Sequence, residues 1–400
     1  MKKPKRSTEA AMAALGCCVI CVLFALLCLS PALSPLLSGS TQEAGEESFA
    51  GEPAASEETE APHEHRFDPV TGVCFDCGEE CPHTQGFGSD HCCLVCGWRC
   101  DNTSHDPETA LCPVCGEAFR HHFGMDCLCD VCGAEAPLVY GELPDRYFEP
   151  NPRAGQCSRE TFTDAEGKER TVAVWLPWDY SEDTLYNVVI LLHGDGGECG
   201  DWVDVEEPTY RGEVRLCDVY DRIVEERLCD PFIVVSVDNS LFKYPPLGES
   251  FLRDSLLPFI AAHYSTYMGT GTLQEIREAR EHTAAGGLSR GSMYTYSCIM
   301  PRCLDIVGNF CCFSNGDNSR VYVQLNSADS IDYPVKSYIA TCGKADELIV
   351  TIAHKNVFRS ITSNVLRITD GENARLFEIE AGHNFIMWTA SVYDALLLMF

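Results

Sequence analysis

The residues with the clearest chemistry form a Gly-x-Ser-x-Gly pattern at Gly287, Ser289 and Gly291. This pattern presents a serine on a sharp turn between a strand and a helix, where its hydroxyl group can attack a carbonyl carbon. Large side chains would clash at such a turn, and residues 284–287 are all Ala or Gly. The spacing therefore predicts acyl transfer by a nucleophilic serine.

A nucleophilic serine needs a base that takes its proton and an acid that orients the base. His383 lies in a loop after a predicted strand at 374–380, and it follows both the serine and the acid in the expected order. Asp346 follows a predicted buried strand, at the sheet edge where a carboxylate can reach the base. The other bases considered are His193, His263 and His282. The other acids considered are Asp317, Glu347 and Asp370.

Two backbone N–H groups must stabilise the oxyanion of the tetrahedral intermediate. One is expected from Arg290, which follows the serine. The second is expected from the loop after residues 186–192, where Gly194, Gly196 and Gly197 let the backbone approach a substrate. The guanidinium group of Arg290 has two interpretations, contact with an acidic substrate or an ion pair with a surface carboxylate.

Cysteines form the second pattern with chemistry, because four Cys-x-x-Cys-Gly units recur between residues 74 and 133. Two thiolates at this spacing converge on one metal ion, and the glycine adopts a conformation that brings backbone N–H groups toward the sulfurs. The cysteine pairs are Cys74 and Cys77, Cys93 and Cys96, Cys112 and Cys115, and Cys129 and Cys132.

Each cysteine pair is preceded by a second pair of candidate ligands, which gives the four ligands of a tetrahedral zinc site. The preceding pairs are His63 and His65, Cys81 and His83, Cys100 and His105, and His121 and His122. In the last unit Cys127 is an alternative to either histidine. Disulfide bonds are the competing interpretation of these cysteines, but they do not explain the regularly placed histidines. The expected role of zinc is structural, since four protein ligands leave no open coordination position.

The remaining composition bounds the location and the partners of this 400-residue chain. A net charge of -31 argues against nucleic acid and anionic membrane surfaces as partners. Residues 1–37 combine a basic start with an uncharged stretch long enough for a membrane anchor, which would leave the rest outside the cytoplasm. Cleavage as a signal peptide, and thus secretion, is the alternative. Residues 38–62 read as an acidic, flexible linker.

The elements that must position the serine, base and acid follow from residue 140 onward. Buried strands are predicted at 186–192, 231–237 and 335–341, an alternating strand at 171–177, and a helix at 251–264. Strands that alternate with helices indicate an α/β fold with a mostly parallel sheet. Cysteines in apolar surroundings, such as Cys311 and Cys312, are interpreted as small core residues.

Several motifs together give a family resemblance over residues 156–400. They are Leu-Leu-His-Gly-Asp-Gly-Gly at 191–197, Asp-Trp at 201–202, Gly-Gly-Leu-Ser-Arg-Gly-Ser at 286–292, Cys-Gly-Lys-Ala-Asp at 342–346 and Gly-His-Asn-Phe at 382–385. This order resembles the esterase family of α/β hydrolases that includes feruloyl and acetyl xylan esterases, S-formylglutathione hydrolases, enterochelin esterases and mycolyltransferases. The resemblance implies that Asp346 is the acid and that the N–H of Asp195 is the second oxyanion donor.

These observations predict an α/β-hydrolase domain at 140–400, preceded by zinc-binding repeats at 63–136, a linker and an anchor. The expected function is a serine esterase acting on an acylated polysaccharide or a similar small ester, with no cofactor for catalysis. Two alternatives stay open: an acyltransferase with the same triad, and a binding protein in which the zinc repeats, with a protein partner, carry the function.

Overall fold

The computed structural model describes most of the chain after residue 65. The described residues are 66–75, 77–83, 87, 92–100, 105–116, 118–149, 151–203, 216–315, 321–326 and 332–400. The predicted anchor and linker lie outside them, as do His63 and His65. In the part of the chain that is described, no helix is both long and apolar enough to cross a membrane. All described residues belong to one compact unit, His65–Phe400.

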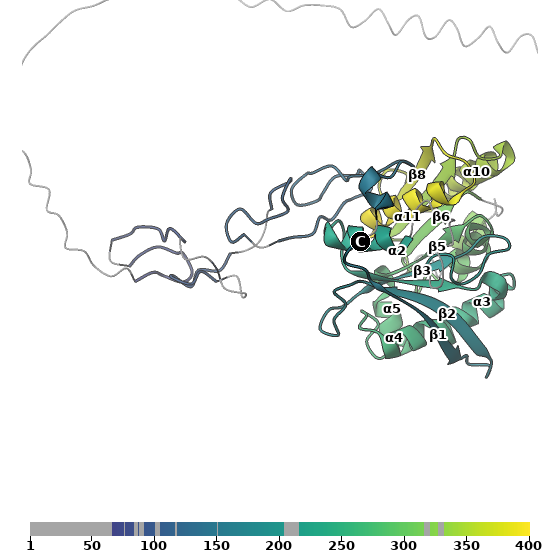
Figure 1. Cartoon of the computed structure of the whole chain (residues 1–400), viewed down its shortest axis with the longest axis horizontal. Coiled ribbons are helices and arrows are strands. Elements are labelled where there is room, and N and C mark those ends of the chain that lie inside the picture. Colours follow the sequence, from purple (N-terminus) through teal and green to yellow (C-terminus); the bar gives the residue numbers. More distant parts are fainter. Residues whose placement is uncertain are drawn as a thin grey trace, which may run out of the picture. The chain divides into compact units, whose positions relative to one another are not determined.

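An eight-stranded sheet organises residues 156–400, which are called the sheet domain together with the segment from residue 140 that precedes them (Figure 1). The strands are β1 (Gln156–Thr163), β2 (Glu169–Leu176), β3 (Asn187–Leu192), β4 (Phe232–Val237), β5 (Thr283–Leu288), β6 (Asn309–Phe313), β7 (Ser337–Gly343) and β8 (Ala374–Ile379). Their order is β1-β2-β4-β3-β5-β6-β7-β8. Only the β1–β2 and β2–β4 pairs are antiparallel, which confirms the prediction of a mostly parallel sheet.

Every residue of β3 to β7 is buried, because helices cover both faces of the sheet. The helices are α2 (Leu216–Glu225), α3 (Pro245–Phe251), α4 (Leu257–His263), α5 (Leu273–Glu278), α6 (Arg290–Tyr294), α7 (Met300–Arg302), α8 (Val321–Leu325), α10 (Leu348–Asn364) and α11 (Phe385–Met399). Residues of α2 and α11 pack on one face, and residues of α3, α4, α5 and α10 pack on the other. Figure 1 shows α2 and α11 beside each other.

The predicted helix at 251–264 begins earlier than expected. Helical structure starts at Pro245, passes through a π-helical turn at Leu252–Leu256 and ends at His263. Proline is favourable in the first helical turn, because its missing N–H group would have no partner there. This earlier start was not predicted, since the apolar periodicity becomes regular only later.

Strand β6 was not predicted, although its cysteines were interpreted as core residues. Cys311 and Cys312 are both fully buried, which confirms that interpretation. They alternate between the faces of the sheet, since Cys312 belongs to the apolar cluster that includes α3 and α10, and Cys311 to the one that includes α11. Burial raises the pKa of Cys312 to about 12, so this thiol stays neutral and behaves as a small apolar group.

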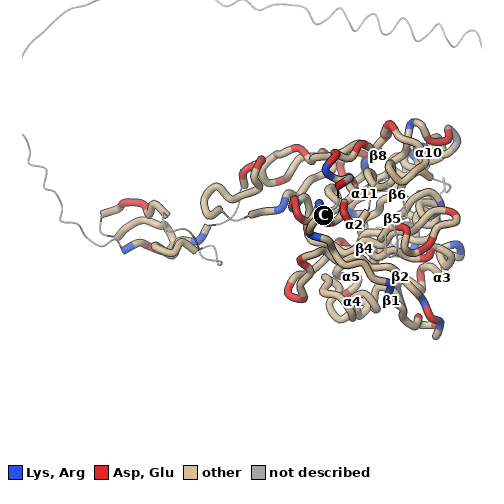
Figure 2. The backbone as a smooth tube through the Cα atoms, viewed as in Figure 1, with Lys and Arg blue, Asp and Glu red and all other residues tan. Residues whose placement is uncertain are grey.

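The Cys-x-x-Cys units fold as short hairpins. Isolated antiparallel bridges join Phe67 to Cys74, Phe87 to Cys93 and Phe123 to Cys129. The glycines that follow the four units have φ values from 71° to 75°, as expected for this turn; they are Gly78, Gly97, Gly116 and Gly133. Figure 2 shows Asp and Glu spread over the repeats and the sheet domain, with Lys and Arg interspersed.

Candidate functional site

Ser289 occupies the turn between β5 and α6. Its φ of 48° and ψ of -109° are unusual for a residue with a side chain, and this strained turn presents the hydroxyl group at the end of the strand. Gly287 and Gly291 flank the serine, and a Cβ atom on either one would clash with the carbonyl oxygen of Leu192 on β3. The close packing of β5 and α6 against β3 therefore requires glycine at both positions.

Ser289, His383 and Asp346 form a chain of hydrogen bonds. The Oγ atom of Ser289 lies 3.0 Å from Nε2 of His383, and Nδ1 of His383 lies 2.9 Å from Oδ2 of Asp346. The side chain of Asp346 is fully buried, whereas that of His383 is 34% exposed. The Oδ1 atom of Asp346 accepts the backbone N–H of Glu347 at 2.6 Å. These contacts fit an imidazole that donates from Nδ1 to the acid and accepts the serine proton at Nε2.

The ring of His383 is held from the side of α11. His383 lies in the loop between β8 and α11, and the Trp388 ring meets it edge-on at 4.9 Å between centroids. Trp388 is fixed in turn, because its Nε1 donates to Oγ of Ser314 at 3.0 Å. Asn384 caps the helix by accepting the N–H of Met387 at 3.1 Å. The start of α11 therefore determines where the imidazole stands.

The two expected oxyanion donors face each other, with Asp195 in the loop after β3 and Arg290 at the start of α6. Among the described residues, the backbone N–H groups of Asp195 and Arg290 have no hydrogen-bond acceptor within the protein. The two side chains contact each other, with Nε to Oδ1 at 2.9 Å and Nη2 to Oδ2 at 3.0 Å. The hydrogen bond to Asp195 raises the pKa of Arg290. Of the two interpretations of this guanidinium group, the structure shows the ion pair within the chain.

The end of β3, which leads into the Asp195 loop, is fixed by buried side chains. Trp202 is fully buried, and its Nε1 donates to the carbonyl oxygen of Leu192 at 3.0 Å. The next residue, His193, is buried and accepts the backbone N–H of Asn239 at its Nε2 atom, at 3.2 Å. His193 thus supports the loop rather than contacting Ser289.

The other described candidate bases and acids make their contacts elsewhere. Nδ1 of His263 contacts the Phe259 carbonyl oxygen at 2.7 Å, and Nδ1 of His282 contacts Oδ1 of Asn187 at 2.9 Å. Glu347 is exposed, Asp370 lies in the turn before β8, and Asp317 is outside the described residues. His354 was missed as a candidate base because no motif marks it within its helical segment. It is fully buried on α10, and burial lowers its pKa to about 4.

Cys81, His83, Cys93 and Cys96, called the second cluster, come together as the repeat pattern predicts. Their ligand atoms all lie within 4.8 Å of one another. The Sγ atoms of Cys81 and Cys93 are 3.8 Å apart, as are Sγ of Cys96 and Nδ1 of His83. Backbone N–H groups donate to Sγ of Cys93 at 3.4 Å and of Cys96 at 3.3 Å. This set can hold a tetrahedral ion.

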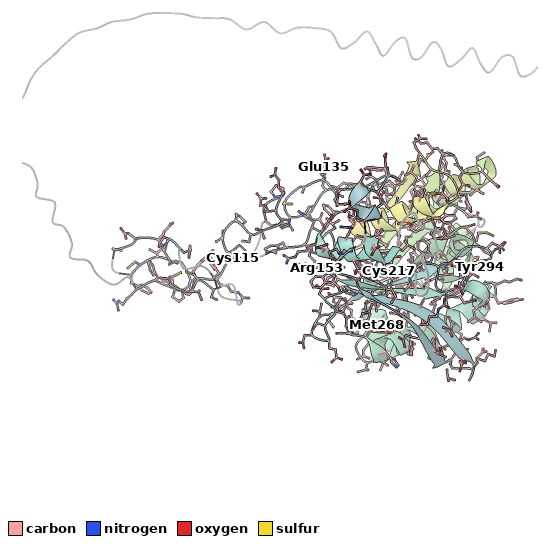
Figure 3. The ribbon with its side chains drawn as sticks, in the orientation of Figure 1. Cys115, Glu135, Arg153, Cys217, Met268 and Tyr294 are labelled. Carbon is pink, nitrogen blue, oxygen red and sulfur yellow. The ribbon has the colours of Figure 1, made fainter. Side chains whose placement is uncertain are left out.

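The third and fourth ligand sets differ from the prediction. Cys100, Cys112 and Cys115 gather as the third cluster without His105 (Cys115 is labelled in Figure 3). His105 instead joins His121, Cys129 and Cys132, and these four are called the fourth cluster.

His122 and Cys127 are not in the fourth cluster. The side chain of His122 is 51% exposed and lies 3.9 Å from Asp230. His121 and His122 are adjacent, and neighbouring side chains of an extended chain point in opposite directions, so only one can face the cluster. The Sγ atom of Cys127 faces the Met125 carbonyl oxygen at 3.9 Å.

Comparisons with known proteins agree with the architecture. No protein-family model matches the chain. Endo-1,4-beta-xylanase Y of Acetivibrio thermocellus is 31% identical over 178 residues, which are 44% of this chain and 16% of that protein. The chain thus spans a small part of the length of this relative.

Among solved structures, a mutant of the feruloyl esterase module from Clostridium thermocellum in complex with sinapinate superposes with a TM-score of 0.56. That match has 24% identity and covers 70% of this chain and 96% of the module. It shows that the sheet domain has the α/β-hydrolase fold.

Proposed function

We propose that the sheet domain is a serine carboxylic ester hydrolase that works through an acyl-enzyme on Ser289. The observation that carries this proposal is the relay from Ser289 Oγ through His383 to the buried carboxylate of Asp346, with contacts of 3.0 and 2.9 Å. A hydroxyl group is a weak nucleophile by itself, and a hydrogen-bonded imidazole makes it effective by accepting its proton during attack.

The reaction then follows from the placement of these groups. Ser289 Oγ attacks the ester carbonyl carbon while His383 Nε2 takes its proton, and Asp346 stabilises the resulting imidazolium. The N–H groups of Asp195 and Arg290 receive the developing oxyanion. His383 returns the proton to the leaving alcohol, which departs. Water, deprotonated by the same imidazole, then attacks the acyl-enzyme, and the acid product is released.

The proposed substrate is an acylated polysaccharide or a similar small ester. Two likenesses support this class: the sequence match to a xylanase and the shared fold with a feruloyl esterase module. The first name refers to xylan, and the second to feruloyl esters with sinapinate bound. If an alcohol is added to an ester hydrolysis assay, transfer of the acyl group to that alcohol would instead indicate an acyltransferase.

A fluorophosphonate probe on the full chain tests the proposed nucleophile. We expect the unaltered protein to label, and Ser289→Ala to lose labelling and ester hydrolysis together. Ser363→Ala is the matched control, because this serine is exposed on α10, far along the chain from the motif. Labelling of Ser289→Ala at the rate of the control would remove Ser289 from this role.

The repeats are proposed to hold zinc as a structural ion. The second cluster supports this, because three cysteines and one histidine fit the ligands and the tetrahedral geometry that zinc prefers. Hairpins of this size have few apolar residues, so metal binding would supply much of their folding free energy. Catalysis by the relay requires no metal.

A further inference from the structure

The fourth cluster has the dimensions of a tetrahedral metal site. Nε2 of His105 lies 3.2 Å from Nδ1 of His121 and 3.6 Å from Sγ of Cys129, and Sγ of Cys132 lies 3.5 Å from Nδ1 of His121. Zinc bond lengths give tetrahedral edges of about 3.3 Å between two nitrogens and about 3.5 Å between nitrogen and sulfur. The measured distances match these edges.

The histidine that completes this cluster comes from an earlier repeat. His105 precedes the Cys112 and Cys115 pair in the sequence, whereas His121 directly precedes the Cys129 and Cys132 pair. An ion held by all four side chains of the fourth cluster would therefore cross-link two successive repeats. His105, His121 and Cys129 are each less than 10% exposed, so the ion would be shielded from solvent.

The hairpin that carries this cluster packs into the sheet domain. Phe123, Met125 and the ligand Cys129 belong to the same buried apolar cluster as α2, α11 and the end of β8. The guanidinium group of Arg375, on β8, donates a hydrogen bond to the Met125 carbonyl oxygen. A metal ligand thus forms part of the core of the sheet domain.

The segment that leaves the fourth cluster is bound to α11. The buried carboxyl group of Asp394 accepts the N–H groups of Val139 at 2.7 Å and Tyr140 at 3.1 Å. The Tyr393 hydroxyl group donates to the Pro137 carbonyl oxygen at 3.2 Å. Both tyrosine and aspartate lie on the helix whose first turn positions His383.

Within the described part of the chain, the second cluster lacks such contacts and provides a natural comparison. Its buried cysteines, Cys81, Cys93 and Cys96, pack with Phe67, Phe87 and Trp98, which all belong to the repeats. Among the described residues, this apolar cluster includes none from the sheet domain. Metal bound there would stabilise its own hairpins only.

We propose that a zinc ion bound by His105, His121, Cys129 and Cys132 fastens the last repeat to the sheet domain and stabilises that domain. The ion fixes the hairpin whose Phe123 and Met125 fill the core beside α11. Without it, two thiols and two imidazoles would be held together with no charge to bind them, and the hairpin would separate from β8 and α11. This role is distinct from ester hydrolysis, which needs no metal.

Two matched variants of the full chain test the proposal. Cys132→Ser and Cys96→Ser each remove the second cysteine of a Cys-x-x-Cys unit, in the fourth and second clusters respectively. We expect each to lose about one zinc per chain by elemental mass spectrometry. Only Cys132→Ser should lower the thermal midpoint of the sheet domain, by about 5 °C or more. An equal shift in both variants, or no shift in Cys132→Ser, would overturn the proposed fastening.

The ligand set is tested by His105→Ala against His122→Ala. We expect His105→Ala to lose one zinc and His122→Ala to retain all of them, since His122 is half-exposed and faces Asp230. The reverse result overturns the assignment. If Cys132→Ser does not fold, chelator titration of Cys96→Ser gives the answer: the midpoint of its sheet domain should fall as the remaining zinc is removed, and a constant midpoint refutes the proposal.

Discussion

Replacing Asp346 by Asn should disable the relay by reversing the proton pattern of His383. The Oδ1 atom of Asp346 accepts the Glu347 N–H at 2.6 Å, in a position where only an oxygen is acceptable. In Asp346→Asn the amide oxygen should therefore take this position, which turns the NH₂ group toward Nδ1 of His383. The imidazole then keeps its proton on Nε2 and cannot accept one from Ser289.

The magnitude follows from the cost of the alternative orientation. Turning the amide would put an NH₂ group against the Glu347 N–H and lose this hydrogen bond, which costs about 0.5 to 1.5 kcal/mol. The competent orientation is then a minor population, and even there a neutral amide stabilises the imidazolium less than a carboxylate does. For an analogous triad substitution kcat falls about 10⁴-fold, which corresponds to about 5.5 kcal/mol. We expect a loss of this size here, with KM nearly unchanged.

The assay is steady-state hydrolysis of a chromogenic acetate ester, together with the rate of fluorophosphonate labelling. Glu347→Gln is the matched control, because the side chain of Glu347 is exposed and the substitution leaves its backbone N–H in place. Circular dichroism and the thermal midpoint show whether Asp346→Asn is folded. A folded Asp346→Asn protein that loses less than tenfold in kcat would refute the orientation of His383 by Asp346, as would an equal loss in Glu347→Gln.

Two further predictions concern groups outside the triad. Burial raises the pKa of Asp394 to about 7, so the folded chain keeps a proton that the unfolded chain releases near pH 4. The free energy of unfolding should therefore fall by roughly 4 kcal/mol as the pH rises from 4 to 7. Asp394→Asn should remove this component from the pH dependence measured by urea denaturation, and an unchanged slope would contradict the buried carboxyl group. The Sγ atoms of Cys157 and Cys217, on β1 and at the start of α2, are only 2.9 Å apart (Cys217 is labelled in Figure 3). Oxidised glutathione should link them by a disulfide bond, because the two thiols pass two electrons and two protons to glutathione disulfide and yield two glutathione thiols. Peptide mass spectrometry should find this pair in the unaltered protein and not in Cys157→Ser. A different pairing would contradict the prediction.

The sheet domain was largely predictable because its strands carry strong local patterns. Residues 188–192 and 232–235 are continuous apolar stretches, and they lie within β3 and β4 at the centre of the sheet. The relay residues were found because each follows a strand end: parallel strands bring their carboxyl ends to one edge, where Ser289, Asp346 and His383 meet. Strand β6 was missed, since two adjacent cysteines in a five-residue strand leave no clear periodicity.

The candidate metal ligands were predictable as pairs but not as complete sets, for a physical reason. Cys-x-x-Cys spacing is a local property, so each cysteine pair was identified from sequence. The partner ligands arrive from segments whose path depends on the packing of successive hairpins, which spacing does not encode. His121 and His122 illustrate this. Both were predicted as ligands of one site, but side chains alternate along an extended chain, so adjacent residues point in opposite directions. His122 points outward, and the buried His105, from another segment, joins His121, Cys129 and Cys132 in its place. That exchange links the repeats to each other and, through Cys129, to the core beside α11.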